Sequence, residues 1–478
     1  MLRYFLRNAL LVVVLNFLVK GIYLLVVERS VQNLLPEGDY GLYFSLFNLS
    51  LLFQLIADLG LQQYNNRQLS QHRQLLAKYF PYFLGLKLLL FGLFLIALFL
   101  GGSVLQYDKD TMSLLAIIGL NLGLNSFLLF LRTNLSGLGF YRLDSWVSVV
   151  DKLLMLVFIG GLILLAPDFL TVKRFALAQT MAWLVACVLL LFLLWPRLPH
   201  RWPRWRPSIS WSLLRQAAPY ALVVLLMTAY TRIDAVMIER LLTDGQVQAD
   251  HYAAAYRLLD AANMGGFLLA GLLLPMFARL LGQRESVGPL LGLATPLALV
   301  GAVCVSVPLV LLAQPTMDAL YHFADERTAL ILAWLIPSFI AVCGNYVYGS
   351  LCTAAGELRR MNQIFVVGVL LNLIGNLLVL PTYGAIGCAG ITTLTQSSIT
   401  IALIVLAHRR LDLSGNQLSW WRLLLFFGLY AFSVWGLEQL LDLSWWIELM
   451  LLGSWGLLLA FGLQVLQLQR LKQALQAS

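Results

Sequence analysis

Charged residues are scarce in this sequence of 478 residues. Asp, Glu, Lys and Arg make up 12% of it, whereas ordinary soluble domains contain about 25%. Hydrophobic residues make up 60%. A soluble fold could not bury so large an apolar fraction, because the surface of a folded chain does not shrink fast enough with size. The composition therefore excludes a soluble globular protein and predicts an all-α polytopic membrane protein.

Several catalytic motifs are also absent. The sequence contains no G-x-x-x-x-G-K-[ST] phosphate loop, which argues against direct ATP hydrolysis, and no H-E-x-x-H zinc motif. The five cysteines all lie in apolar runs and the five histidines are far apart, so neither a disulfide framework nor a metal centre is expected. We therefore expect no cofactor and no enzymatic activity. One alternative stays open: Glu37-Gly38-Asp39 could hold a divalent metal in a membrane glycosyltransferase, although its composition is typical of a turn.

Long apolar segments are abundant instead. A membrane-spanning helix needs about 20 apolar residues, and about fourteen segments meet this length. They are residues 8–27, 41–62, 80–101, 112–132, 146–166, 175–195, 214–238, 251–278, 288–312, 328–351, 361–380, 384–407, 420–440 and 444–466. The connections between them are short, so the sequence predicts about fourteen transmembrane helices without a sizeable soluble domain.

The longest polar stretch, PRLPHRWPRWRPSISWS at 196–212, divides the chain. It predicts an N-terminal six-helix lobe over 1–195, a cytoplasmic Arg/Pro/Trp linker over 196–212, a C-terminal six-helix lobe over 213–410 and two additional helices within 411–478. LSGLGFYR at 135–142 and TAAGELRR at 353–360 end corresponding helices in a similar way. This weak repeat favours two pseudo-symmetric lobes related by an axis along the membrane normal.

Lys and Arg are concentrated in the loops on the side of the N-terminus. The positive-inside rule then predicts cytoplasmic N- and C-termini, and Arg470 and Lys472 agree with this orientation. The net charge of +9 is explained by topology and by contact with anionic membrane lipids. We expect no nucleic-acid partner.

Eight of the charged residues inside the apolar segments are the most informative, because charges there usually face a protein interior or a watery cavity. They are Lys20, Asp58, Lys87, Asp151, Arg232, Asp234, Arg257 and Asp260. Lys20 and Lys87 have no acidic neighbour on their own helices, so we expect them to line a cavity and to bind an anion. The spacing places Lys20 in the outer half of the membrane, and Asp58 and Asp151 near cytoplasmic helix ends, within reach of interfacial water.

The other four charges belong to two neighbouring segments, and two interpretations stay open for them. Arg257 and Asp260 are three residues apart and can share a helix face, and contacts to Arg232 and Asp234 across the helices are plausible. The four could form an internal pairing network without a ligand. Alternatively, Arg232 and Arg257 could bind substrate while Asp234 and Asp260 balance their charge or couple transport to an ion.

Four stretches resemble one family of membrane proteins. LLPEGDYGLYFSLFNLSLLFQLIADLGLQQYNNR at 34–67 and APYALVVLLMTAYTRIDAVMIERL at 218–241 are two of them. The others are YAAAYRLLDAANMGGFLLAGLLLPMFARL at 252–280 and GNYVYGSLCTAAGELRRMNQIFVVGVLLNLIGNLLVLPTYGAIGCAGITTLTQSS at 344–398. They are similar to segments of the polysaccharide flippases of O-antigen and exopolysaccharide assembly, in the multidrug/oligosaccharidyl-lipid/polysaccharide (MOP) transporter superfamily.

The resemblance implies a function in cell-surface polysaccharide and lipopolysaccharide biosynthesis. Members move oligosaccharides linked to undecaprenyl diphosphate from the cytoplasmic to the outer leaflet of the bacterial plasma membrane, by alternating access of a central cavity. Other polysaccharide-assembly proteins are possible partners. Arg257 and Asp234 match positions where relatives often have an arginine and an acid. Two other functions stay open: a cation-coupled drug or metabolite antiporter of the same superfamily, and a glycan polymerase, ligase or glycosyltransferase.

Overall fold

The structure, a computed structural model, describes residues 17–62, 75–137, 140–194, 207–411, 413, 418–440 and 443–466. Every regular element within these ranges is a helix, so the predicted all-α class is confirmed. The first half of the segment at 8–27, most of the predicted linker, and Arg470 and Lys472 lie outside the described residues. The chain forms two compact units, Met1–Asp250 and His251–Ser478. The division into six-helix lobes at 196–212 stays a prediction.

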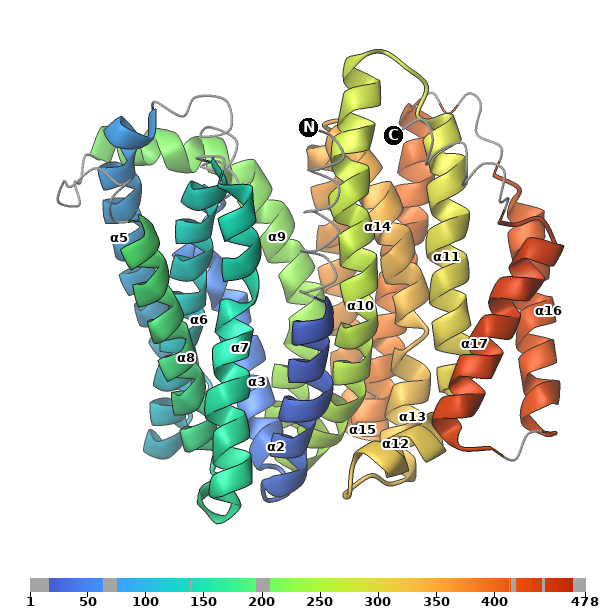
Figure 1. Cartoon of the computed structure of the whole chain (residues 1–478), viewed down its shortest axis with the longest axis horizontal. Helices are drawn as coiled ribbons and strands as arrows, with labels where there is room; N and C mark the ends of the chain where they lie inside the picture. Colours follow the sequence, from blue (N-terminus) through green and yellow to red (C-terminus); the bar gives the residue numbers. More distant parts are fainter. Residues whose placement is uncertain are drawn as a thin grey trace. The chain divides into compact units, whose positions relative to one another are not determined.

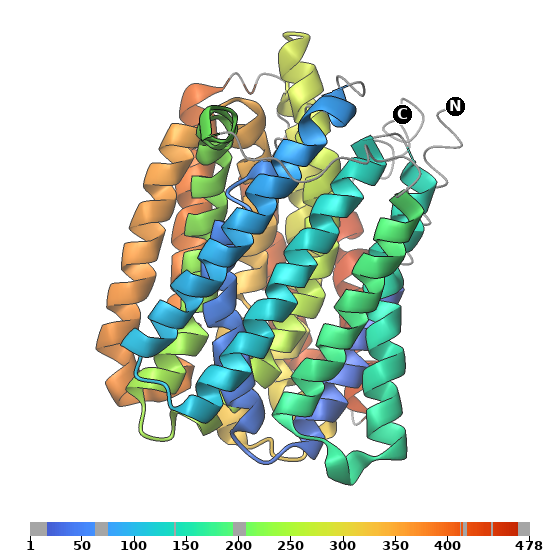
Figure 2. The same cartoon turned by 90° about the vertical axis from the view of Figure 1, so that its left-hand side faces the viewer.

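The first unit is a bundle of long helices. Its elements after residue 22 are η1 (Tyr23–Glu28), α2 (Arg29–Leu34), α3 (Asp39–Gln54), η2 (Leu55–Ala57), α5 (Leu75–Val104), α6 (Lys109–Gly137), α7 (Tyr141–Leu165), η3 (Pro167–Phe169), α8 (Val172–Leu194) and α9 (Pro207–Leu241). Helix α6 packs against α3, α5, α7 and α8, and these helices run side by side (Figure 1, Figure 2). α3 also packs against α9.

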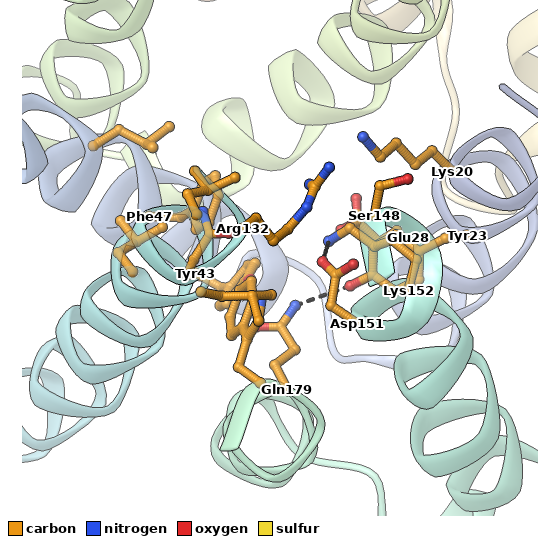
Figure 3. Close-up of a pocket in the computed structure, with 16 residues that line it drawn as sticks. Lys20, Tyr23, Glu28, Tyr43, Phe47, Arg132, Ser148, Asp151, Lys152 and Gln179 are labelled. Atoms are coloured by element: carbon orange, nitrogen blue, oxygen red, sulfur yellow. Dashed lines mark hydrogen bonds and ion pairs between the residues drawn. The ribbon is translucent and has the colours of Figure 1, made fainter. Parts of the chain in front are cut away.

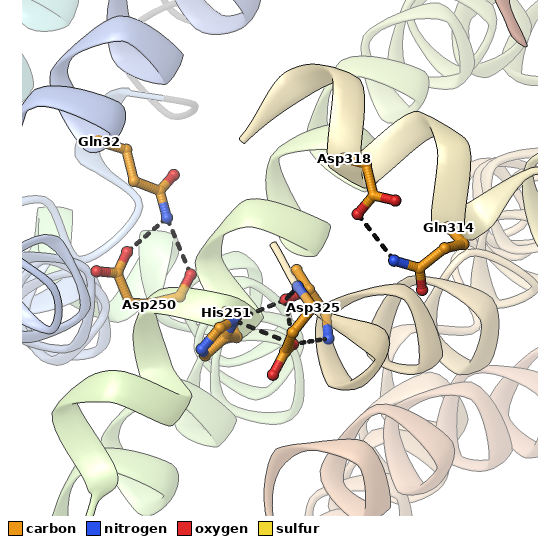
Figure 4. Close-up of polar contacts among 7 residues, drawn as sticks. Gln32, Asp250, His251, Gln314, Asp318 and Asp325 are labelled. Carbon is orange, nitrogen blue, oxygen red and sulfur yellow. Dashed lines mark hydrogen bonds and ion pairs between the residues drawn. The ribbon is translucent and has the colours of Figure 1, made fainter. Parts of the chain in front are cut away.

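The first helix is longer than its apolar run predicts. Residues 17–22 are helical, and the helix continues through the π-helical turn η1 and through α2 to Leu34, beyond the predicted end at residue 27. Polar residues end the apolar run, but they have partners inside the unit. The buried Gln32 amide donates hydrogen bonds to the carbonyl and the carboxylate oxygens of Asp250 (Figure 4).

The turn before α3 is bound to the same carboxylate. The backbone N–H of Gly38 donates to Asp250 Oδ2 at 3.0 Å. One turn of helix later, the chain of α3 approaches the start of α10 so closely that a Cβ at Gly41 would overlap the Gln246 carbonyl oxygen. Glycine at position 41 therefore permits a backbone contact that any larger residue would prevent.

The second unit begins inside α10 (Gly245–Gly282). Its further elements are α11 (Gly288–Leu311), α12 (Ala313–Leu320), α13 (Glu326–Leu335), α14 (Ser338–Ala354), α15 (Leu358–Arg410), α16 (Trp420–Glu438) and α17 (Trp445–Gly462). α11 packs against α14, α16 and α17 (Figure 1). The short helix α12 was not predicted from the sequence.

The number of membrane-spanning helices agrees with the sequence. Twelve helices in the described ranges are long and apolar enough to cross a membrane. One of them, α15, has 53 residues and would be about 80 Å long if straight, more than twice the apolar thickness of a bilayer. It bends at Gly384, whose φ of 55° and ψ of −144° are not helical, and so provides the two predicted spans 361–380 and 384–407. The twelve helices thus contain thirteen of the fourteen predicted spans, and the remaining one, at 8–27, lies only in part within the described residues.

The last two helices pack on α11. Their buried residues form one apolar cluster with those of α11, which includes Val300, Phe426 and Leu452. The Tyr430 hydroxyl of α16 donates to the Leu452 carbonyl of α17 at 3.0 Å. The two additional helices are thus joined to the second unit by a shared core.

Candidate functional site

The first unit contains a cavity of about 310 Å³ bordered by the first helix, α3, α6, α7 and α8 (Figure 3). Its polar and aromatic lining consists of Lys20, Tyr23, Glu28, Tyr43, Phe47, Asn125, Arg132, Ser148, Asp151, Lys152, Gln179 and Trp183. Several of these side chains point into the same space in Figure 3, although they come from five helices. We refer to this space as the unit 1 cavity.

Helical spacing explains why these residues share one space. Asn125 and Arg132 are seven residues apart on α6, Gln179 and Trp183 are four apart on α8, and Ser148 is four residues before Lys152 on α7. Residues at these intervals lie on one face of a helix. This spacing is visible in the sequence. A search for polar residues four or seven positions apart within one apolar segment would have found lining residues that a search for charges alone missed.

Two of the three lining cations form an ion pair with a carboxylate. Arg132 Nε donates to Asp144 Oδ1 at 2.9 Å. Lys152 Nζ is 3.9 Å from Asp151 Oδ2 and lies 4.6 Å above the ring of Tyr23. Such a position over an aromatic face stabilises an ammonium group.

A chain of hydrogen bonds fixes one wall of the unit 1 cavity. The Tyr43 hydroxyl donates to Gln179 Oε1 at 2.9 Å, and Gln179 Nε2 donates to the Tyr23 hydroxyl at 3.0 Å. All three side chains are buried. The wall therefore joins the first helix, α3 and α8, and holds the aromatic rings that border the cavity.

Lys20 lines a cavity, as expected, and it shares this cavity with Asp151. The sequence placed Lys20 in the outer half of the membrane and Asp151 near a cytoplasmic end, and these depths stay predictions. The first helix extends to Leu34, which puts Lys20 about 21 Å before the end of that helix. The role of Lys20 in substrate binding stays a prediction.

Lys87 borders a second cavity, of about 140 Å³, as expected, but it already has a carboxylate partner inside the protein. Its ammonium group lies 2.7 Å from Asp58 Oδ1 and 2.8 Å from Ser126 Oγ. The Lys87 side chain is 3% exposed and that of Asp58 is 21% exposed. Its partner comes from the end of η2 rather than from α5, which explains why the sequence of α5 alone suggested an uncompensated charge. This ion pair argues against substrate binding by Lys87.

The remaining four predicted residues belong to two helices. Arg232 and Asp234 lie on α9 in the first unit, and Asp234 is buried. Arg257 and Asp260 lie on α10 in the second unit. The contacts predicted across these helices, and the roles in binding or coupling, stay predictions.

Arg257 has one partner that the sequence did not suggest. Its Nη1 donates to the Tyr321 hydroxyl at 2.8 Å, within the second unit. Arg257 is buried, and its guanidinium carbon is 5.7 Å from the centre of the Tyr321 ring. The segment after α12 thus positions an intramembrane arginine.

A second cluster, at the end of α9, was also missed. The buried Glu239 carboxylate accepts a hydrogen bond from the Tyr107 hydroxyl at 2.9 Å and lies 3.2 Å from Arg240 Nε. Burial, together with the Glu239 charge, raises the pKa of Tyr107, which lies between α5 and α6, to about 12. The Arg240 guanidinium stacks 3.6 Å from the Tyr107 ring centre. This cluster ties α9 to the α5–α6 connection.

The acidic stretch at 37–39 forms the turn before α3, where Gly38 is bound to Asp250. Within the described ranges, no three His, Cys, Asp or Glu side chains are grouped as metal ligands. The geometry therefore favours the turn interpretation of this stretch.

A polar cluster in the second unit surrounds the start of α13 (Figure 4). Asp325 caps this helix by accepting the Thr328 backbone N–H at 2.9 Å, and His251 Nδ1 lies 2.6 Å from Thr328 Oγ1. Partial burial opposes ionisation of Asp325, but the hydrogen bonds from Thr328 outweigh it and lower the pKa of the carboxyl.

Comparison with known proteins agrees with this architecture. The family profile described as "Polysaccharide biosynthesis protein" matches residues 5–281. No match was found among curated proteins. The lipid II flippase MurJ in an inward closed conformation is 14% identical with a TM-score of 0.59, and the alignment covers 92% of this chain and 98% of MurJ.

Two further solved structures have the same fold. An inward-facing multidrug resistance MATE family transporter of the MOP superfamily has 13% identity and a TM-score of 0.64, covering 81% of this chain and 94% of its own. A MOP superfamily transporter from Pyrococcus furiosus has 14% identity and a TM-score of 0.53, and the alignment covers 86% of this chain and 94% of that transporter. The family profile, with these folds, confirms the resemblance found in the sequence. The chain therefore belongs to the polysaccharide biosynthesis protein family and has the fold of the MOP superfamily.

Proposed function

We propose that this protein is a flippase that moves a lipid-linked oligosaccharide from the cytoplasmic to the outer leaflet of the bacterial plasma membrane. Its substrate would be linked to undecaprenyl diphosphate and used in cell-surface polysaccharide assembly, such as that of O-antigen. The family and the twelve described helices that are long enough to cross a membrane support transport rather than catalysis. Both termini would be cytoplasmic.

The observation that best supports this proposal is the unit 1 cavity. A glycan and its diphosphate are polar, and neither crosses a hydrocarbon core without protein groups that replace water. Lys20, Asn125, Asp151 and Gln179 provide ammonium, amide and carboxylate groups at the level of membrane-spanning helices. Charges at this depth usually line substrate paths. Arg257, which is bound to Tyr321, and Arg232 are further candidates for contact with the diphosphate.

Leaflet exchange in liposomes tests the proposal. The purified protein is reconstituted with a fluorescent lipid-diphosphate oligosaccharide, and a membrane-impermeant reductant bleaches the outer leaflet. Protein-free vesicles should lose about half of their fluorescence, because only the outer leaflet is bleached, and we expect vesicles with wild type to lose more. Leaflet exchange by Lys20→Ala should be at least about tenfold slower than by wild type, since charge-assisted hydrogen bonds are the stronger ones.

Lys173→Ala is the matched control, because this lysine lies on α8 outside the cavity and its side chain is 45% exposed. It should behave like wild type. Equal bleaching by wild-type and protein-free vesicles, for several glycans and with an imposed ion gradient, would contradict the proposal.

A further inference from the structure

Two lining groups of the unit 1 cavity lack a partner, and both are hydrogen-bond donors. Trp183 is 4% exposed, and its indole N–H has no hydrogen-bond acceptor in the described part of the chain. Lys20 forms no ion pair or hydrogen bond with any described residue. A buried donor without an acceptor is costly, and native proteins rarely leave one unless a ligand or water meets it. The missing partner must therefore present acceptor oxygens.

The charges around the unit 1 cavity limit how negative such a ligand can be. Arg132 and Lys152 have Asp144 and Asp151 as nearby carboxylates, so their charges are largely compensated. The carboxylates of Asp151 and Glu28 also line the cavity and would repel a polyanion such as a diphosphate. Lys20 is the third lining cation; it forms no ion pair with a described residue, and only the more distant Asp151 carboxylate acts on its charge. One negative charge matches this arrangement better than two or three.

The remaining lining groups suit a sugar. Asn125, Ser148 and Asp151 provide an amide, a hydroxyl and a carboxylate, all of which can bind sugar hydroxyls. Lys152 lies 5.4 Å above the ring of Trp183, so this ring face is already covered, while the N–H at its edge stays without a partner. A volume of about 310 Å³ is at the small end of ligand pockets, which suits one sugar ring rather than a whole oligosaccharide.

We propose that the unit 1 cavity binds one sugar residue of the substrate glycan that bears a single negative charge, such as a uronic acid. Lys20 would pair with its carboxylate, and the Trp183 N–H would donate to a carboxylate or ring oxygen. This inference rests on the proposed flippase function and specifies its substrate. Lys20 and Trp183 would then determine specificity for acidic glycans, and the diphosphate would be bound elsewhere.

The test uses two fluorescent lipid-diphosphate oligosaccharides that differ only in one residue, a hexose in one and the corresponding uronic acid in the other. Leaflet exchange is measured for each substrate at limiting concentration. We expect wild type to move the acidic substrate about tenfold faster than the neutral one, the effect of one charge-assisted hydrogen bond. The ratio of the two rates does not depend on the amount of folded protein, so partial misfolding of a variant does not change it.

Lys20→Met and Trp183→Phe should each lower this ratio toward one, and Lys20→Arg should keep it. Trp183→Phe retains an aromatic ring under Lys152 and removes only the N–H donor. Trp446→Phe, an exposed residue of α17, is the matched control and should keep the wild-type ratio.

The outcomes separate the two proposals. If wild type moves neither substrate, the flippase function fails, and this inference with it. If wild type moves both substrates at equal rates, or if Lys20→Met slows both equally, flipping stands but the acidic-sugar site is overturned. An unchanged ratio in both Lys20→Met and Trp183→Phe would also overturn it.

Discussion

Replacing Asp58 by Asn removes the carboxylate partner of Lys87, which is otherwise enclosed within the first unit. The Lys87 side chain is 3% exposed, and its ammonium group would keep only Ser126 Oγ, at 2.8 Å. Breaking one side of a buried ion pair typically costs about 3–5 kcal/mol, because an uncompensated charge remains. Because Asp58 itself is 21% exposed, we expect the lower end of this range for the free energy of unfolding.

Lys87→Met should cost less. The Asp58 carboxylate that remains is partly exposed and still accepts the Gln62 backbone N–H at 3.3 Å. We expect a loss of about 1–2 kcal/mol, which is typical when a buried polar group loses its partner. The double variant leaves no unpaired charge, so its loss should be smaller than the sum of the single losses by about 2 kcal/mol.

Equilibrium unfolding in detergent micelles measures the four free energies of this double-mutant cycle. Each variant is compared at the same protein and detergent concentration. If the losses of the single variants add within about 0.5 kcal/mol, as they do for independent sites, then the Lys87–Asp58 pair does not stabilise the first unit and our reasoning is refuted.

Two further predictions concern packing and capping. Gly41→Ala should lower the free energy of unfolding by about 1–3 kcal/mol, because its Cβ would overlap the Gln246 backbone. By contrast, a Cβ at Gly265 would meet no atom within 4 Å, so Gly265→Ala should be neutral or stabilising by up to about 1 kcal/mol. Equal changes in thermal stability for the two glycine variants would contradict this. Asp325→Ala should cost about 1 kcal/mol at neutral pH, because the cap to Thr328 is lost. The pKa of Asp325 is lowered in the folded protein, so its stabilisation is present above the unfolded pKa of about 3.9 and is lost as the pH falls through the folded pKa. The unfolding curves of wild type and Asp325→Ala should therefore converge in acid. A difference in stability that is constant with pH would refute this.

The sequence predicted the helices well because bilayer thickness imposes a length that apolar runs reveal directly. The run at 80–101 lies within α5, and the break between 361–380 and 384–407 coincides with the bend at Gly384. The first helix was predicted too short because its last turns are polar. Their stability depends on contacts such as Gln32 with Asp250, which sequence periodicity does not contain.

The candidate site was less predictable for a physical reason. A cation near a helix end can serve membrane topology or line a cavity, and composition does not distinguish these roles. Arg132 and Lys152 were therefore not among the eight candidates taken from the sequence, although they line the unit 1 cavity. Lys87 shows the opposite error, since its partner Asp58 is 29 residues away and comes from another helix. Only the packing of helices determines which charges meet.

Leaflet exchange of a lipid-diphosphate oligosaccharide by wild type and by Lys20→Ala tests the central claim most directly. Our account predicts that wild-type vesicles lose fluorescence beyond the outer-leaflet half, that Lys20→Ala vesicles with the same amount of folded protein are at least about tenfold slower, and that Lys173→Ala vesicles match wild type. Exchange by Lys20→Ala at the wild-type rate would show that the unit 1 cavity does not bind the transported substrate. Exchange no faster than in protein-free vesicles would contradict the flippase function itself.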